Sequence, residues 1–191
     1  MTDGRWIDVA DRVHARRYGE ESRRKRIAQH RAGGGPDIAD ALARTTITPP
    51  NRVLCADAAL DLGGRVVRLL HPGPGHTDHD VLVHVADVGV VFAGDLVEHG
   101  PHGWTADSFS SDTHVRRWPA ALDAILALSP RVVVPGHGDP VDAGFVARHR
   151  DGLARLVELG DAVKEGRLTE DEGLARAPCP PDVTRAFLAS V

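Results

Sequence analysis

Three short apolar runs in the middle of the chain each lead into a loop that carries a histidine or an aspartate next to glycine. The runs are residues 66–70, 88–93 and 131–134, and the loops after them contain Gly75-His76-Thr77-Asp78-His79-Asp80, Gly94-Asp95 and Pro135-Gly136-His137-Gly138. Apolar, β-branched runs of this length are typical of buried strands. Imidazoles and carboxylates at strand ends are the donors that zinc takes in proteins. The sequence therefore predicts strands that present a metal site at their ends.

His76, Asp95 and His137 are the predicted ligands. Asp95 follows a hydrophobic run, where a carboxylate is costly unless it is paired or metal-bound. His137 lies between two glycines, which let the backbone bring its imidazole close to a partner. Asp80 is expected to support the site by accepting a hydrogen bond from a ligand imidazole or from loop amides. The three ligands are expected to converge at one end of the sheet.

The strand region contains two predicted hairpins. Residues 58–62 and 65–70 flank Gly63-Gly64, and residues 81–85 and 88–93 flank Asp87. His84 alternates within a strand, so we expect it to face solvent. The other histidines near the strand ends are also expected at the surface, although one of them could replace a ligand; they are His71, His79, His99, His102 and His114.

Helical segments flank the strands. Residues from about 7 to 44 have helical spacing, which Gly33-Gly34-Gly35-Pro36 interrupts before Asp37 caps a second helix through about Ala43. Further helices are predicted over residues 118–128, over 145–159 with Asp142 as the cap and Gly160 at the end, and after the capping box of Thr169 and Glu172. Strands, then a helix, then another strand favour an α/β layered fold.

The motifs GHTxxD, GD and PGHG, taken in this order, resemble the metallo-β-lactamase superfamily over residues 52–142. The resemblance implies one domain over residues 1–191 with an αβ/βα sandwich, and a site for one or two zinc ions that uses His76, Asp95 and His137. The family's His-x-His-x-Asp-His segment does not occur in these residues. We therefore expect a truncated, N-terminally incomplete domain that holds at most one ion weakly.

The resemblance implies a metal-dependent hydrolase that acts on an ester, thioester, lactone or phosphoester. Asp95 stands where zinc β-lactamases generally carry cysteine or serine, so the chain is similar to the glyoxalase II-like branch, and β-lactam hydrolysis is not expected. The loop from Glu98 to Asp112, with Trp104 and Phe109, is the predicted substrate-facing wall. The alternative is a degenerate, non-catalytic member that serves as an interaction module.

The resemblance implies a small-molecule substrate, and the composition gives no sign of a nucleic-acid or membrane partner. The net charge is −4, and Asp11, Glu20 and Glu21 lie among the basic residues that lead up to the run at residues 23–26, so a solvated helix face is expected rather than a nucleic-acid or membrane surface. Cys55 and Cys179 are isolated, no apolar leader or membrane-spanning stretch occurs, and a cytoplasmic location is expected. Exposed apolar surface at an incomplete sheet is expected to promote self-association.

Overall fold

The computed structural model describes residues 6–8, 23–46, 48, 52–54, 57–100, 103–110 and 112–191, with the backbone alone for 6–8 and 52–54. The chain divides into two compact units, Gly4–Cys55 and Ala56–Val191, the latter together with Met1–Asp3. The larger unit contains all three predicted ligands. The assignment of the whole chain to one domain stays a prediction.

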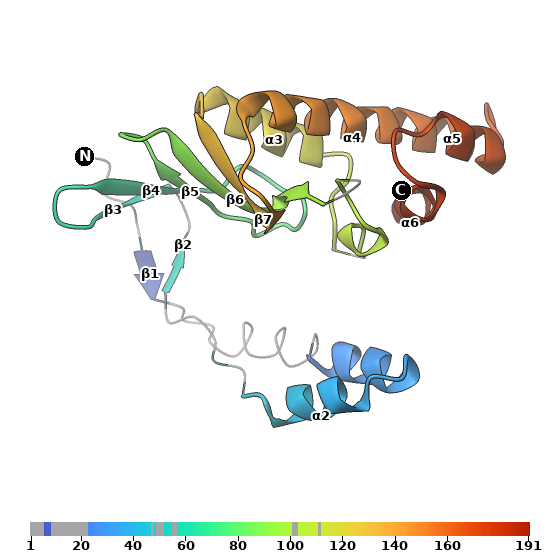
Figure 1. Ribbon diagram of the computed structural model, residues 1–191, viewed down its shortest axis with the longest axis horizontal. Helices are drawn as coiled ribbons and strands as arrows, with labels where there is room; N and C mark the ends of the chain where they lie inside the picture. The colour runs from blue at the N-terminus through green and yellow to red at the C-terminus, as the bar shows by residue number, and fades with distance from the viewer. Residues whose placement is uncertain are drawn as a thin grey trace. The chain divides into compact units, whose positions relative to one another are not determined.

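A mixed five-stranded sheet is the centre of the larger unit (Figure 1), and its strand order is β3-β4-β5-β6-β7. The strands are β3 (Ala58–Asp61), β4 (Val66–Leu70), β5 (Leu82–Val85), β6 (Val90–His99) and β7 (Val132–Gly138). The pairs β3–β4, β4–β5 and β5–β6 are antiparallel, whereas β7 is parallel to β6. Both predicted hairpins are confirmed. Gly63 and Gly64 make the first turn with φ angles of 81° and 102°, which suit glycine.

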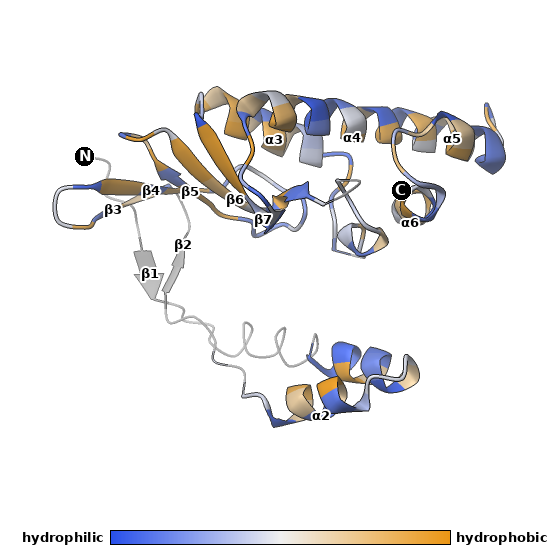
Figure 2. Ribbon diagram, in the orientation of Figure 1, coloured by the Kyte–Doolittle hydropathy of each residue, from blue (hydrophilic) through white to orange (hydrophobic). Residues whose placement is uncertain are grey.

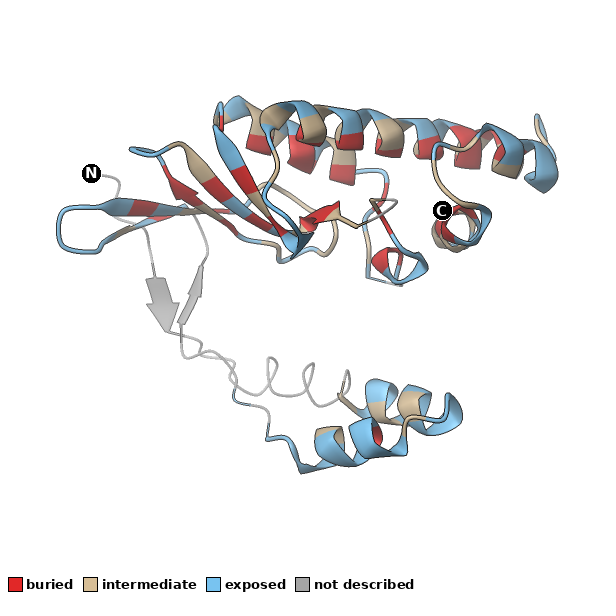
Figure 3. Ribbon diagram, viewed as in Figure 1, coloured by how far each residue is buried: buried red, intermediate tan, exposed pale blue. Residues whose placement is uncertain are grey.

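Helices α3 (Trp118–Ala127) and α4 (Ala143–Lys164) cover one face of this sheet. Helices α5 (Glu170–Arg176) and α6 (Pro181–Ser190) pack against α4, and α6 also contacts a 3₁₀ turn, η1, at Ala106–Ser108. In Figure 1, α3 and α4 lie side by side over the sheet, and α3 provides the connection that lets β7 run parallel to β6. Figure 3 shows the buried residues along the side of α4 that faces the sheet. The predicted α/β class is confirmed.

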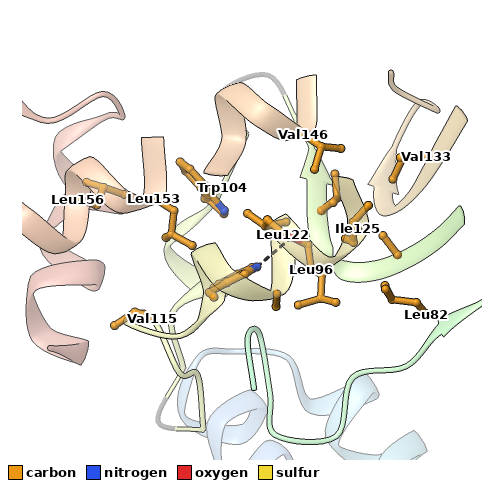
Figure 4. Close-up of a cluster of buried hydrophobic side chains, with 14 of the residues drawn as sticks. Leu82, Leu96, Trp104, Val115, Leu122, Ile125, Val133, Val146, Leu153 and Leu156 are labelled. Carbon is orange, nitrogen blue, oxygen red and sulfur yellow. Dashed lines mark hydrogen bonds between the residues drawn. The ribbon is translucent and has the colours of Figure 1, made fainter. Parts of the chain in front are cut away.

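The core lies between these helices and the strands (Figure 4), where Leu96, Leu122 and Ile125 are fully buried. Figure 2 shows that the central strands and α3 are the most apolar segments. Trp104 and Phe109 also belong to this core, with exposed fractions of 6% and 8%. Their prediction as a substrate-facing wall is wrong, because both rings are needed to fill the space between η1 and the helices.

The helix caps are partly as predicted. Asp142 caps α4 by accepting a hydrogen bond from the Phe145 amide at 2.7 Å, and Thr169 forms the predicted capping box with Glu172. Gly160 does not end α4, which continues to Lys164. A Cβ at Gly160 would lie 3.2 Å from Phe187 Cε1, so this glycine lets α6 pack closely against α4.

His84 is buried, with an exposed fraction of 7%, so its prediction as a solvent-facing residue is wrong. The side chain shares a face of the sheet with Leu82, two residues earlier, and that face packs against the helices. Desolvation lowers the pKa of His84, and the Arg68 charge lowers it further. The opposite face is open in part, because Phe92 and Val132 are 44% and 37% exposed.

In the smaller unit, β1 (Trp6–Asp8) pairs antiparallel with β2 (Arg52–Leu54). Helix is confirmed for residues 23–32 and for α2 (Pro36–Arg44), with the predicted break at the glycines. The predicted start of helix near residue 7 is wrong, because pairing with β2 makes that segment a strand; residues 9–22 lie outside the described part. Gly35 is the N-cap of α2, and Asp37 lies in its first turn without a capping bond.

Two sequence predictions concern the whole chain. Across the described residues, no helix combines the length and the apolar character needed to cross a bilayer. Cys179 is a free thiol beside Thr184, with 3.2 Å between Sγ and Oγ1. Cys55 lies outside the described residues, so its predicted lack of a disulfide stays a prediction.

Candidate metal centre

The loop between β4 and β5 holds His76 against the core. A Cβ on Gly75 would lie 2.5 Å from Leu96 Cδ2 and 3.3 Å from Ala121 Cβ, so a side chain at this position would force the Leu96 side chain to move. The His76 imidazole meets the Trp118 ring edge-on, with 5.6 Å between ring centroids. The Trp118 indole N–H in turn donates to the Leu96 carbonyl at 3.0 Å. His76 is therefore held by packing, and its side chain is 19% exposed.

Asp80 organises the same loop. Its carboxylate accepts hydrogen bonds from the Thr77 amide at 2.7 Å and from the Thr77 hydroxyl at 3.0 Å. The closest Asp80 oxygen lies 3.9 Å from His76 Nδ1, which is too long for a hydrogen bond. Asp80 was predicted to accept a hydrogen bond either from a ligand imidazole or from a loop amide. The structure contains the second of these, the bond from the Thr77 amide.

Asp95 lies inside a bulged strand rather than at a strand end. The pairing of β6 with β7 shifts between Gly94 and Glu98, because Gly94 pairs with Pro135 and Glu98 with His137. Between these two pairs the chain advances by four residues on β6 but by only two on β7. Bulges of this kind bend a strand and redirect a side chain. Gly94 adopts a φ of 56° where the irregularity begins, and Asp95 follows it directly.

His137 comes close to Asp95 because Gly136 has no side chain. A Cβ at Gly136 would overlap Asp95 Oδ1 and would lie 2.8 Å from the Asp95 amide nitrogen. With glycine in this position, 3.5 Å separates His137 Nε2 from Asp95 Oδ1. The two residues come from different strands, 42 positions apart in the chain. The glycine before His137 therefore has a steric role in the site.

Glu98 is a buried carboxylate on the same strand as Asp95, and the sequence prediction did not single it out. Its side chain is 6% exposed, and Oε2 accepts a hydrogen bond from Ser108 Oγ at 2.6 Å. Burial raises the pKa of the Glu98 carboxyl, while the Ser108 hydrogen bond and the charges of His76 and His137 lower it and that of Asp95 raises it. The argument made for Asp95 would have identified Glu98, because it follows the apolar pair Leu96-Val97.

The structure thus brings Asp95 and His137 into contact, and it places both of them and His76 close enough to Glu98 to influence its ionisation. In donor type, two imidazoles and a carboxylate suit zinc. Within the described part of the chain, however, no three His, Cys, Asp or Glu side chains stand close enough together to hold an ion as they are. The His137 and Asp95 side chains are 72% and 42% exposed, so they can change rotamer without unpacking the core.

The neighbouring histidines have other contacts. His79 Nδ1 lies 2.8 Å from Asp78 Oδ1, and the His71 ring accepts a hydrogen bond from the Gly73 amide at 3.2 Å. The His114 amide donates to the Gly75 carbonyl at 2.9 Å, so its backbone fixes the His76 loop. His99 stacks edge-on against Phe145, with 5.1 Å between ring centroids. His102 lies outside the described residues.

Comparisons with known proteins converge on one family. The sequence profile of the metallo-beta-lactamase superfamily matches residues 5–137. Over 82 residues the chain is 32% identical to a "Metallo-beta-lactamase type 2" of Bacteroides fragilis, covering 42% of this chain and 32% of that protein. Over 96 residues it is 27% identical to a protein of the same name from Bacillus cereus, covering 49% of this chain and 37% of that protein. The chain thus spans about a third of the length of these curated relatives.

Solved structures of similar proteins have the same family name. A metallo-beta-lactamase from Pontibacter korlensis is 25% identical, with a TM-score of 0.49 over 60% of this chain and 53% of that one. The DIM-1 metallo-beta-lactamase is 24% identical, with a TM-score of 0.46 over 53% of this chain and 46% of the other.

Proposed function

The chain belongs to the metallo-β-lactamase superfamily, and from this membership we propose that it is a zinc-dependent hydrolase whose ion is held by His76, Asp95 and His137. The contact between Asp95 and His137 across the bulged junction of β6 and β7, with 3.5 Å between side-chain atoms, is the observation that carries the proposal. A surface aspartate and histidine would not need a redirected strand and a glycine that makes room for them.

Each residue of the site has a defined part in this proposal. Zinc, when bound, supplies a Lewis acid that polarises the bond to be cleaved and lowers the pKa of water. His76 and His137 bind through neutral imidazoles, and Asp95 through its carboxylate. Trp118 fixes the ring plane of His76 by edge-on packing, and Asp80 keeps the loop of His76 folded through its bonds to Thr77.

The substrate is proposed to be a small ester, thioester, lactone or similar compound. Aspartate at position 95 supports this class, because the resemblance places cysteine or serine there in zinc β-lactamases. The curated relatives are named as metallo-beta-lactamases, so a β-lactam is included in the test as the substrate for comparison. These bonds all present a carbonyl carbon that water attacks and a carbonyl oxygen that gains charge. A cytoplasmic location is proposed as well, on the isolated cysteines.

The direct test is hydrolysis of a panel containing an ester, a thioester, a lactone and a β-lactam. We expect turnover of at least one of the first three to appear with zinc and to disappear with a chelator. Asp95→Asn should lose the zinc-dependent part, because the amide is a poor ligand, while the exposed Asp182→Asn should retain it. Turnover that ignores the chelator, or that survives in Asp95→Asn, would contradict the proposal.

A second candidate is a non-catalytic family member that serves as an interaction module and associates with itself. The exposed apolar side chains Phe92 and Val132, on the sheet face away from α3 and α4, favour this candidate. The same assays distinguish the two functions. Zinc-independent background in every variant, together with a concentration-dependent molecular mass in sedimentation, would support the second.

A further inference from the structure

A cleft of about 460 Å³ lies where the second half of α4 meets the turn after it and α5 (Figure 1). Its apolar part is formed by Leu159, Ala162 and Leu168, of which the first two are 2% and 6% exposed. The charged residues that line it are Arg155, Glu158, Asp161, Arg167 and Arg176. Small-molecule sites have volumes of about 300–1,000 Å³ and combine apolar surface with a few polar groups, so this cleft has the size and the lining of such a site.

The backbone around the cleft is fixed by hydrogen bonds and close packing. The amides of Arg167 and Leu168 both donate to the carbonyl of Ala162, at 2.8 and 3.1 Å, so the turn after α4 is tied back to the helix. A Cβ on Gly173 would lie 2.9 Å from Val163 Cγ2, because α5 packs closely against α4 at this position. The cleft therefore has a defined shape that is set by the two helices and the turn between them.

The charged lining of the cleft favours an anion. Its three cations come from three separate segments, and they are Arg155 of α4, Arg167 of the turn and Arg176 at the end of α5. The two carboxylates of the lining are Glu158 and Asp161. Asp161 is already paired at 2.6 Å with Arg116, which lies outside the lining. The cleft therefore presents more positive than negative charge to a ligand.

Each of these three guanidinium groups keeps donors for a ligand. Arg155 uses Nη1 for Glu158 at 3.0 Å, and Arg176 comes only within 3.7 Å of Glu172, which is too far for a hydrogen bond. Arg167 places Nε and Nη2 on one oxygen of a neighbouring carboxylate, at 2.7 Å. A guanidinium has five N–H donors, and exposed ion pairs of this kind contribute little to stability. A ligand can therefore bind the remaining donors or replace these carboxylates at little cost.

We propose that this cleft binds a small molecule that carries a phosphoryl group on an apolar body. Guanidinium groups on three sides suit a dianion, because each can donate two parallel hydrogen bonds to phosphoryl oxygens. The apolar body of the ligand contacts Leu159, Ala162 and Leu168. The inference goes beyond the proposed hydrolase and does not depend on it, since no residue of the lining belongs to the candidate metal centre.

The test is a calorimetric titration of the full chain with phenyl phosphate, inorganic phosphate and benzoate, at low ionic strength. A chelator is present throughout, so that no metal ion takes part in binding. Phenyl phosphate should bind more tightly than inorganic phosphate, because its ring covers the apolar part of the cleft. It should bind at least about tenfold more tightly than benzoate, which has a single charge and one pair of oxygens.

Substitutions of the arginines locate the binding. Arg167→Gln and Arg176→Gln change side chains that are 61% and 51% exposed, so the fold is retained, and each should weaken phenyl phosphate at least about tenfold. Arg167→Lys should recover only part of the affinity, because lysine keeps the charge but loses the paired donors. Arg65→Gln is the matched control and should bind like the original chain. Arg65 is also exposed and ion-paired, with Nε 3.0 Å from Asp87 Oδ2, but it lies at the start of β4.

Several results would overturn the proposal. An original chain that does not bind phenyl phosphate, or Arg167→Gln and Arg176→Gln variants that bind like Arg65→Gln, would show that the cleft is not a site. Benzoate that binds as tightly as phenyl phosphate would overturn the choice of a phosphoryl group, and inorganic phosphate that does so would overturn the apolar contact. None of these results bears on the zinc-dependent hydrolase, because the chelator removes its metal.

Discussion

Replacing Gly138 with alanine is expected to lower the free energy of unfolding by roughly 3–5 kcal/mol. Gly138 has a φ of 88°, which a residue with a Cβ seldom adopts. Its Cβ would also overlap the carbonyl oxygen of His99 and would lie 2.6 Å from the His99 carbonyl carbon. Because these are backbone atoms of the neighbouring strand, the clash can be relieved only by separating β6 from β7 at the site.

Gly63→Ala is the matched control for this substitution. Gly63 has a similar φ of 81°, but nothing lies within 4 Å of the Cβ that alanine would add. It should therefore cost only the backbone strain, about 1–2 kcal/mol. Equilibrium unfolding in urea, monitored by circular dichroism, measures both. Equal losses in the two variants would show that β6 and β7 are not as close at Gly138 as the structure has them.

The stability of the larger unit is expected to fall in acid because of His149. This side chain is 6% exposed between Trp104 and Phe145, and desolvation lowers its pKa from 6.5 to about 4. Between these values the unfolded chain binds the proton and the folded chain does not. The contribution of neutral His149 to the free energy of unfolding is fully present above pH 6.5. It is lost as the pH falls to about 4, and the total loss is roughly 3 kcal/mol.

His149→Phe isolates this contribution, because the ring is kept and the titration is removed. The raised pKa of Glu98 acts in the opposite direction, since the folded chain then binds the proton first as the pH falls. The quantity to measure is therefore the difference between the original chain and the variant in urea, at pH 7 and at pH 4.5. The exposed His71→Gln should lose as much stability between pH 7 and pH 4.5 as the original chain. If His149→Phe loses as much stability between pH 7 and pH 4.5 as the original chain, His149 is not the group responsible for the loss.

Local patterns predicted much of this fold from the sequence. Gly63-Gly64 between alternating runs specified a hairpin, and Asp142 specified where α4 begins, because turns and caps are made by residues adjacent in the chain. The ends of elements were less predictable. α4 continues through Gly160 because α6, far along the chain, packs against that position. No local signal contains this contact.

The metal site at His76, Asp95 and His137 stays a prediction, and the backbone that positions these residues was predicted only in part. Small residues beside His76, Asp95 and His137 indicated loops built for close approach, and the structure provides the steric reason at Gly75 and Gly136. The extension of β6 through Asp95 to His99 was missed, because a bulge lets a strand continue past an apparent break. Glu98 was missed for the same reason, since it was placed in a loop.

The central claim is that His76, Asp95 and His137 bind one metal ion together. Anomalous diffraction at the zinc absorption edge, from crystals of the chain soaked in excess zinc, tests it most directly. We predict a peak about 2.0–2.2 Å from an imidazole nitrogen of each histidine and from a carboxylate oxygen of Asp95. No peak among these three residues at saturating zinc, or side chains that face different sides of the sheet, would contradict the claim.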